Sequence, residues 1–153
     1  VYTTVHANSV FDVIGRFAHM GVDTYSFVSA LNGILAQRLV RKICEHCAEP
    51  YQPDHQLMLD SGLDPDKVSD FTFRLGRGCG HCRGTGYKGR KALAEILKLN
   101  DTLRELIISR APVSQLKEAA RKAGMRSLRD IAISTVRSGQ TTLQEINRVT
   151  FVS

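Results

Sequence analysis

The chain has 153 residues, of which 42% are hydrophobic, and its 21 Lys and Arg against 15 Asp and Glu give a formal net charge of +6. This length supports one substantial hydrophobic core or two small ones, so a metal need not supply all of the stability. No apolar run approaches the roughly 18 residues of a membrane span, so we expect a soluble chain without a transmembrane segment. The basic residues are spread along the chain, which favours solvated helix faces over a nucleic-acid surface.

The N-terminal part of the chain predicts a strand followed by two helices. Residues 1–5 are β-branched and aromatic, which is typical of a strand. Ser9 can cap a short amphipathic helix that stops before Gly21. Asp23 can cap a longer helix, in which apolar residues recur at helical spacing as far as Ile43.

The middle and C-terminal parts predict a small insert followed by a helical region. Prolines and glycines punctuate the insert and leave a short helix at 55–61 and a strand at 71–75. The apolar spacing of residues 91–99 also suits a helix, but their approach from a glycine-rich hairpin favours a strand, which we predict. Four short helices are expected after it, at residues 101–110, 113–123, 127–138 and 142–149.

The four cysteines of the chain form two C-x-x-C pairs, Cys44 with Cys47 and Cys79 with Cys82, separated by 31 residues. A gap of two residues lets both sulfurs of a pair face one point, so four thiolates can close a tetrahedral Zn²⁺ site. Such a closed site is structural. The alternative is two disulfides or four unrelated thiols, but no secretory leader pattern is visible and disulfides are rare in a reducing cytosol.

The second cysteine pair also looks like a thiol oxidoreductase motif. That chemistry needs the first cysteine at a helix N-terminus, which lowers its pKa. Three glycines in residues 84–89 argue against a helix after the motif, so we do not expect redox activity. The same glycines suit a metal knuckle, because they allow positive φ and turn backbone N–H groups toward the thiolates. His46 and His81 lie inside the pairs, and we predict neither as a ligand.

Motifs for phosphate chemistry are not convincing in this sequence. G-x-x-x-x-G-K-[ST] does not occur, and no Ser/His/Asp or Cys/His catalytic set is apparent. Residues 84–89 have the spacing G-x-G-x-x-G, but they lie against a cysteine knuckle and open no helix, so we do not predict a phosphate site there. His6 stands where the first predicted strand ends, a position at which α/β proteins place ligand-handling residues. From position alone, a histidine that merely bonds to backbone is the favoured interpretation.

Several motifs, in order along almost the whole chain, resemble one protein family. They are Thr3 to Ser9 (TTVHANS), Leu35 to Arg41 (LAQRLVR), Cys44 to Tyr51, Arg77 to Arg90 (RGCGHCRGTGYKGR), Gly124 to Asp130 and Ser138 to Glu145. Together they are similar to the secretion-superfamily ATPases of type II secretion and type IV pilus assembly. One departure is Glu45, where such knuckles often carry proline; this alters the stiffness of the knuckle and not its ligands.

The resemblance implies an α/β fold class with three parts, mainly helical overall. Residues 1–43 would be the end of a RecA-like nucleotide domain, 44–90 a tetracysteine zinc subdomain, and 91–153 a C-terminal helical subdomain. His6 matches the histidine of the family's His box, which approaches the nucleotide phosphates. The resemblance therefore favours a nucleotide-coupling role for His6 over the backbone-bonded alternative.

In function, the resemblance implies a cytoplasmic homo-hexameric ATPase, peripheral to the inner membrane and bound to inner-membrane platform proteins. Its ATP hydrolysis would power pilus or pseudopilus assembly. The phosphate loop and the magnesium-handling carboxylates lie upstream in the family and are missing from this sequence. ATP and Mg²⁺ would thus be cofactors of the full-length protein only, and we expect the chain alone to be inactive, because phosphoryl transfer depends on those parts.

The alternative is a free-standing zinc-binding module for nucleic acid or protein partners. Residues 79–86 match the C-x-x-C-x-G-x-G pattern of chaperone-type zinc fingers, and the chain is basic. Those chaperones carry several copies, however, and this chain carries one. A nucleic-acid surface also interleaves basic residues with exposed aromatics, whereas the aromatics between Phe11 and Phe27 sit among apolar residues, so no nucleic-acid partner is expected.

Overall fold

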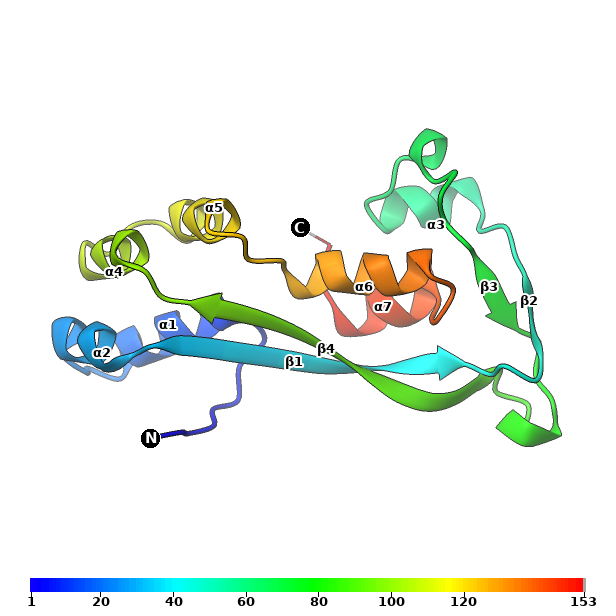
Figure 1. The fold of residues 1–153 in the computed structure, drawn as a ribbon, viewed down its shortest axis with the longest axis horizontal. Helices are drawn as coiled ribbons and strands as arrows, with labels where there is room; N and C mark the ends of the chain where they lie inside the picture. Colours follow the sequence, from blue (N-terminus) through cyan, green and yellow to red (C-terminus); the bar gives the residue numbers. More distant parts are fainter. Residues whose placement is uncertain (153) are drawn as a thin grey trace. The chain divides into compact units, whose positions relative to one another are not determined.

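The structure of the protein is a computed structural model that describes residues 1–152. Within these residues it has seven α-helices, two single turns of 3₁₀ helix and four strands. The strands form two small sheets: β1 (Gly33–Ile43) pairs with β4 (Tyr87–Lys98), and β2 (Ala48–Pro50) pairs antiparallel with β3 (Arg74–Gly76). β1 and β4 run in opposite directions (Figure 1).

The chain divides into two compact units, each built from two segments of sequence. Unit 1 contains residues Val1–Ala36 and Ala94–Ser127, and unit 2 contains Gln37–Leu93 and Leu128–Ser153. The long strands β1 and β4 therefore contribute one end to each unit. The three-part division that the resemblance implies remains a prediction.

Unit 1 is a four-helix unit on the ends of β1 and β4. Its helices are α1 (Val10–His19), α2 (Thr24–Ala30), α4 (Asp101–Ile108) and α5 (Val113–Lys122). Their apolar faces form one core, which contains Val10, Val13, Ile14, Val28, Ile34, Leu97, Leu99, Leu103, Ile107, Leu116 and Ala120. This core fixes the start of α1, where Ser9 accepts a hydrogen bond from the Asp12 N–H and the buried Glu95 of β4 accepts one from the Val10 N–H at 2.9 Å.

Unit 2 packs two helices, α6 (Leu128–Arg137) and α7 (Leu143–Val149), beside β1 and carries α3 (His55–Asp60) and the sheet of β2 and β3. The loop before α7 is bonded to the end of β1: Ile43 N–H donates to the Gln140 carbonyl at 2.9 Å, and Thr141 Oγ1 donates to the Arg41 carbonyl at 2.8 Å. α7 adds the buried Glu145, whose carboxylate accepts hydrogen bonds from the Arg41 backbone and guanidinium. These hydrogen bonds hold the end of β1 against α7 and the loop before it. The first cysteine pair begins at the next residue, Cys44.

Two sequence-based predictions are wrong. Residues 1–5 are extended and exposed but are not a strand, because no described strand lies beside them to complete the hydrogen bonds. The long second helix is only α2, which ends at Ala30; the following residues form β1. In β1, Ile34 and Val40 are buried while Leu35 and Leu39 are exposed. The apolar residues fitted a helical period, but pairing with β4 selected the alternating one.

The other predicted elements are confirmed, with shifted ends. The first short helix, the helix in the insert and the strand after the second cysteine pair are α1, α3 and β4, and the four C-terminal helices are α4, α5, α6 and α7. The strand expected at 71–75 is displaced to β3, which begins at Arg74. Phe73 still accepts a hydrogen bond from the Tyr51 N–H at 3.0 Å, so the pairing extends one residue beyond each strand.

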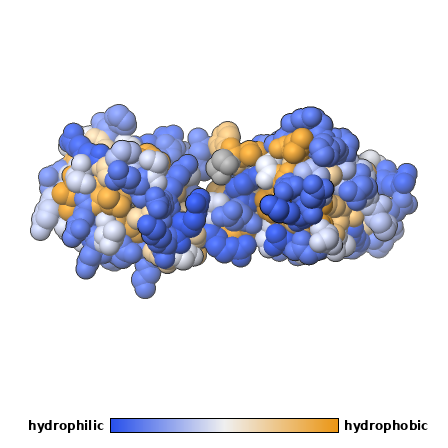
Figure 2. All heavy atoms as spheres, turned by 90° about the horizontal axis from the view of Figure 1, so that it is seen from above, coloured by the Kyte–Doolittle hydropathy of each residue, from blue (hydrophilic) through white to orange (hydrophobic). Residues whose placement is uncertain are grey.

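The surface is that of a polar chain with scattered apolar residues. On the face shown in Figure 2, hydrophilic residues cover most of the visible surface, with smaller hydrophobic areas between them. Among the described residues, no helix combines the length and hydrophobicity needed to cross a bilayer.

Candidate metal centre

The four cysteines come together in unit 2 as the sequence predicts. All four sulfurs lie within 4.8 Å of one another. Three of the separations are 3.9 Å for Cys44 to Cys79, 3.8 Å for Cys47 to Cys82, and 3.8 Å for Cys79 to Cys82. Zinc–sulfur bonds of about 2.3 Å in a tetrahedron give sulfur–sulfur edges of about 3.8 Å. The cysteines are free, and these distances are nearly twice a disulfide bond, so the donor set fits one Zn²⁺.

Local secondary structure places each sulfur. Cys44 follows the last residue of β1, and Cys47 precedes β2. In the second pair, Cys79 caps one turn of 3₁₀ helix, Gly80–Cys82, and Cys82 is the last residue of that turn, ahead of β4. Pairing of β2 with β3 continues as a hydrogen bond of 3.1 Å from the Arg77 N–H to the Cys47 carbonyl. The short sheet therefore brings the two cysteine pairs face to face.

Backbone N–H groups point at two of the sulfurs. Cys82 Sγ accepts from the N–H groups of Cys79 and Gly86, each at 3.2 Å, and Cys47 Sγ accepts from the Gly78 N–H at 3.3 Å. Gly78 and Gly86 have φ values of +99° and +77°, which turn these N–H groups inward. The expectation that a glycine of residues 84–89 turns its N–H toward a cysteine sulfur is confirmed at Gly86. Such donors stabilise negative charge on a metal-bound thiolate.

The surroundings shift the pKa values of two of the thiols, Cys82 and Cys47, in opposite directions. Burial alone raises the pKa of Cys82, but donation from the Cys79 and Gly86 N–H groups outweighs it, and the pKa is lowered to about 6. Burial, together with the neighbouring sulfurs, raises the pKa of Cys47 to about 12. Without a cation, four adjacent thiols cannot all ionise. A divalent metal relieves this conflict, because it binds all four thiolates and its charge offsets half of theirs.

This arrangement does not fit a thiol oxidoreductase. A single 3₁₀ turn does begin after Cys79, although the glycines led us to expect no helix there. The sulfur with the lowered pKa is, however, that of the buried second cysteine, Cys82. The nucleophile of such an oxidoreductase is an exposed first cysteine, so the structure supports a metal ligand and not a reactive thiol.

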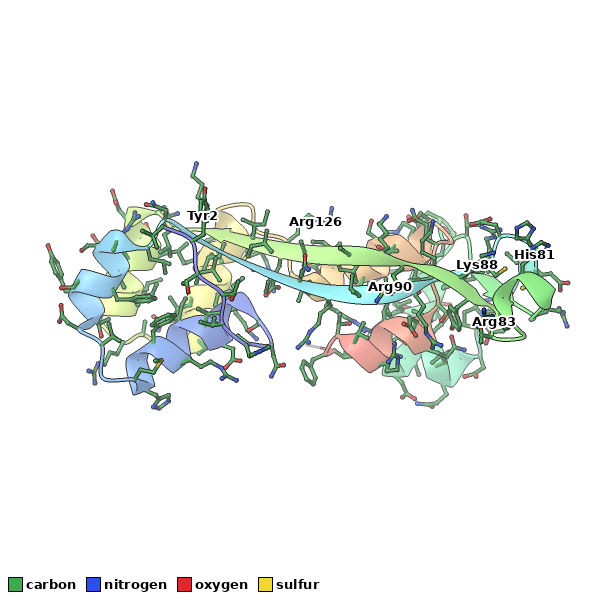
Figure 3. All side chains as sticks on the ribbon, turned by 90° about the horizontal axis from the view of Figure 1, so that it is seen from below. Tyr2, His81, Arg83, Lys88, Arg90 and Arg126 are labelled. Atoms are coloured by element: carbon green, nitrogen blue, oxygen red, sulfur yellow. The ribbon has the colours of Figure 1, made fainter. Side chains whose placement is uncertain are left out.

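The two histidines of the knuckles lie outside the sulfur cluster. The rings of His46 and His81 are exposed and stacked on each other, with centroids 3.8 Å apart and an interplanar angle of 15°. Neither belongs to the group of side chains that could hold a metal. Figure 3 shows His81 at the tip of the cysteine-bearing hairpin, close to Arg83 and Lys88.

The two knuckles also require close backbone contact at Gly76 and Gly86. A Cβ on Gly76 would overlap the Gly86 carbonyl, whereas one on Gly80 would meet no atom within 4 Å. We expect Gly76→Ala to cost about 2 kcal/mol of stability and to weaken zinc binding, because the backbone must shift. Gly80→Ala is the matched control and is expected to leave both unchanged. Chemical denaturation and competition with a zinc chelator measure the two effects; equal behaviour of the variants would contradict the prediction.

His6 belongs to unit 1, whereas the four cysteines belong to unit 2. It is exposed in the extended segment before α1, and the capped start of α1 follows it closely. Two buried carboxylates, Glu95 and Glu145, were not predicted from the sequence; each takes part in a hydrogen bond between a strand and the first turn of a helix. The spacing of Glu145 from the helix cap Thr142 was a usable signal, since an acidic residue three positions after a cap is typical of a capping box.

The fold and the cysteine cluster define a protein of mixed α and β structure with four cysteine sulfurs positioned to bind one metal ion. Residues 1–148 match the family model of the Type II/IV secretion system proteins. The chain belongs to this family.

The curated relatives come from both branches of the family. The chain is 38% identical over 146 residues to the Type IV pilus assembly ATPase PilB of Thermus thermophilus, a match that covers 95% of this chain and 16% of the relative. It is 37% identical over 150 residues to the Type II secretion system protein E of Pseudomonas aeruginosa, covering 98% and 29%. The PilB of Myxococcus xanthus is 38% identical over 147 residues, covering 95% and 26%. The chain thus spans less than a third of each of these relatives.

Proposed function

We propose that the chain is the C-terminal part of a hexameric cytoplasmic ATPase, peripheral to the inner membrane, that powers pilus or pseudopilus assembly. The observation that carries this proposal is the family match over residues 1–148, with pilus and secretion ATPases at almost equal identity. Partners of such a motor are inner-membrane platform proteins. A free-standing zinc module would account for the cysteines but for none of the matched motifs outside them.

In this proposal, the three parts of the chain have different roles. Residues 1–43 complete a RecA-like nucleotide domain, 44–90 form the zinc subdomain, and 91–153 form the C-terminal helical subdomain. Cys44, Cys47, Cys79 and Cys82 hold a structural Zn²⁺, which supplies shape and no open coordination position. ATP and Mg²⁺ bind to parts of the full-length protein that this sequence does not contain.

His6 is the residue of this chain that we place beside the nucleotide phosphates. It stands in the TTVHANS motif, and the structure leaves its side chain exposed. A short, well-anchored connection links it to α1, because Ser9 and Glu95 both bond to the first turn of that helix. Movement of His6 with the phosphates would therefore be transmitted to α1.

The purified chain is expected to bind a fluorescent ATP analogue no better than buffer controls and to hydrolyse no ATP, since phosphoryl transfer depends on the absent phosphate loop. Turnover by the chain alone would contradict this. The chain should support turnover when it replaces the matched segment of the P. aeruginosa relative. In that chimera, we expect His6→Ala to lower the rate by about 100-fold, the usual effect of losing one donor to a developing charge.

The matched control for this experiment is His19→Ala, which removes an exposed histidine from the end of α1. It is expected to leave turnover unchanged. Size-exclusion chromatography and thermal melting establish that each chimera folds and assembles before rates are compared. Equal rates for the His6 and His19 variants would refute the role of His6 while leaving the family assignment intact.

A further inference from the structure

Glu95 of β4 is a carboxylate at a position where the strand pattern predicts an apolar side chain. Buried residues alternate along this part of β4, with Leu93 0%, Glu95 4% and Leu97 1% exposed. Leu97 belongs to the apolar core of unit 1. A buried carboxylate costs free energy unless hydrogen bonds compensate it, so a glutamate here indicates a role that an apolar residue could not fill.

The carboxylate of Glu95 bonds to the beginning of α1. Its Oε1 accepts a hydrogen bond of 2.9 Å from the N–H of Val10, the first residue of that helix. Val10 is itself fully buried in the core of unit 1. Side-chain oxygens that bond the free N–H groups of a first helical turn usually come from the residue just before the helix. Here one comes from a strand 85 positions away along the chain, so it ties the start of α1 to β4.

The local cap of α1 is formed without Glu95. Ser9 Oγ accepts a hydrogen bond from the Asp12 N–H at 3.1 Å, and Asp12 Oδ2 accepts one from the Asn8 N–H at 3.0 Å. These two bonds close the turn that precedes the helix, but they join residues of the same turn and do not reach β4. The bond between Val10 and Glu95 supplies that second connection. Glu95 therefore does more than cap a helix.

The turn that Glu95 anchors begins immediately after His6. Ala7, the next residue, is partly buried and packs against the core of unit 1, whereas His6 and residues 1–5 are exposed. An exposed, extended segment therefore meets an anchored turn at His6. Because the backbone from Ala7 to Val10 is held by the core and by β4, it fixes the point from which the imidazole extends.

We infer that Glu95 is a positioning residue for His6: its bond to Val10 holds the start of α1, and with it His6, in a fixed place relative to β4. The inference rests on the proposed role of His6 at the nucleotide phosphates. Displacing a functional group by about 1 Å can remove much of its effect on a rate. Loss of the bond therefore leaves the nucleotide bound and slows its hydrolysis. The carboxylate acts as a hydrogen-bond acceptor, and its charge is not required.

Steady-state ATPase kinetics of the chimera with the P. aeruginosa relative test the inference, using variants that separate the bond from the charge. Glu95→Asp keeps the charge but withdraws the oxygen from Val10, and we expect kcat to fall about tenfold with KM within about twofold of the unsubstituted chimera. Glu95→Gln keeps an acceptor oxygen at the same reach, so its kcat should stay within about twofold. Glu95→Met keeps the volume without any oxygen and should be as slow as Glu95→Asp; it replaces that variant if the shorter side chain prevents assembly.

Asn100→Ala is the matched control for the loss of a bond at a helix start. Asn100 belongs to the same unit and caps α4, where its Oδ1 accepts a hydrogen bond from the Leu103 N–H at 2.8 Å. We expect its kcat to be unchanged, because α4 does not follow His6. The double variant His6→Ala/Glu95→Asp should be no slower than His6→Ala alone, since a residue that acts through another contributes nothing once the other is removed.

An unchanged kcat in Glu95→Asp would overturn the inference. So would a Glu95→Gln chimera as slow as Glu95→Asp, which would indicate that the charge matters, or a double variant slower than His6→Ala by the full factor, which would indicate a separate structural effect. Failure of both Glu95→Asp and Glu95→Met to assemble would show that the bond serves the fold and not His6 in particular.

Hydrogen exchange of the Val10 amide in the chain alone separates this inference from the proposed function. The amide should exchange faster in Glu95→Asp and at the original rate in Glu95→Gln, because only the first variant loses the bond. If exchange responds in this way but His6→Ala leaves turnover unchanged, the nucleotide role of His6 is wrong. If His6→Ala slows turnover but exchange at Val10 does not respond, the anchoring by Glu95 is wrong.

Discussion

Cys82→Ser is expected to abolish stable zinc binding and to unfold the segment that joins the two knuckles. Two backbone N–H groups donate hydrogen bonds to the sulfur of Cys82, and these bonds stabilise its thiolate as a ligand. A serine hydroxyl is shorter and far less acidic, so the tetrahedral site cannot close. Structural zinc supplies on the order of 10 kcal/mol to its own small domain at neutral pH. Elemental analysis should therefore fall from about one zinc per chain to almost none, and hydrogen exchange should lose protection between Cys44 and Gly86.

His81→Asn is the matched control for this variant, because His81 lies inside the same knuckle but stacks on His46 outside the sulfur cluster. It should retain about one zinc and the same exchange protection. The helices of unit 1 should be unaffected in both variants, since their core contains no residue of the metal centre. A Cys82→Ser protein with full zinc content and unchanged melting would rule out the four-thiolate site.

Glu145→Ala is expected to lower the free energy of unfolding by about 3 kcal/mol, the usual cost of removing one partner from a buried ion pair. The Glu145 side chain is fully buried, and it bonds to the guanidinium groups of Arg41 and Arg148 and to the Arg41 N–H. Its loss leaves a cavity and an unbonded N–H on β1. Glu45→Ala is the matched control, because that carboxylate bonds to Arg74 but is 65% exposed, and we expect no measurable change. Urea unfolding compares the two.

The same carboxylate predicts how stability depends on pH. Burial alone raises the pKa of Glu145, but the hydrogen bonds from Arg41 and Arg148 outweigh it and lower the pKa from its ordinary value of 4.5 to about 2. The stabilisation is thus fully present above pH 4.5 and is lost as the pH falls toward 2. Glu145→Ala should flatten this part of the stability curve. If wild type and variant lose stability in parallel over this range, the buried ion pair is not its source.

The cysteine cluster could be predicted in full, and β1 could not. The spacing within each C-x-x-C pair constrains two sulfurs through a single local turn, so it indicates a metal site before any tertiary contact is known. The apolar residues between Leu31 and Ile43 fit both a helical and an alternating period, and only β4, distant in sequence, decides between them. For β4 itself, the glycine hairpin before it supplied local information, which is why the strand was correctly expected.

By itself, the sequence determined which cysteines form one cluster, most helix positions and the family, since each follows from short-range spacing or from motifs in order. Tertiary structure alone decided that β1 is a strand, that the first residues are not, and that Arg129 and Glu145 are buried. The physical reason is that strand hydrogen bonds and buried charges depend on partners remote in sequence, which no local pattern specifies.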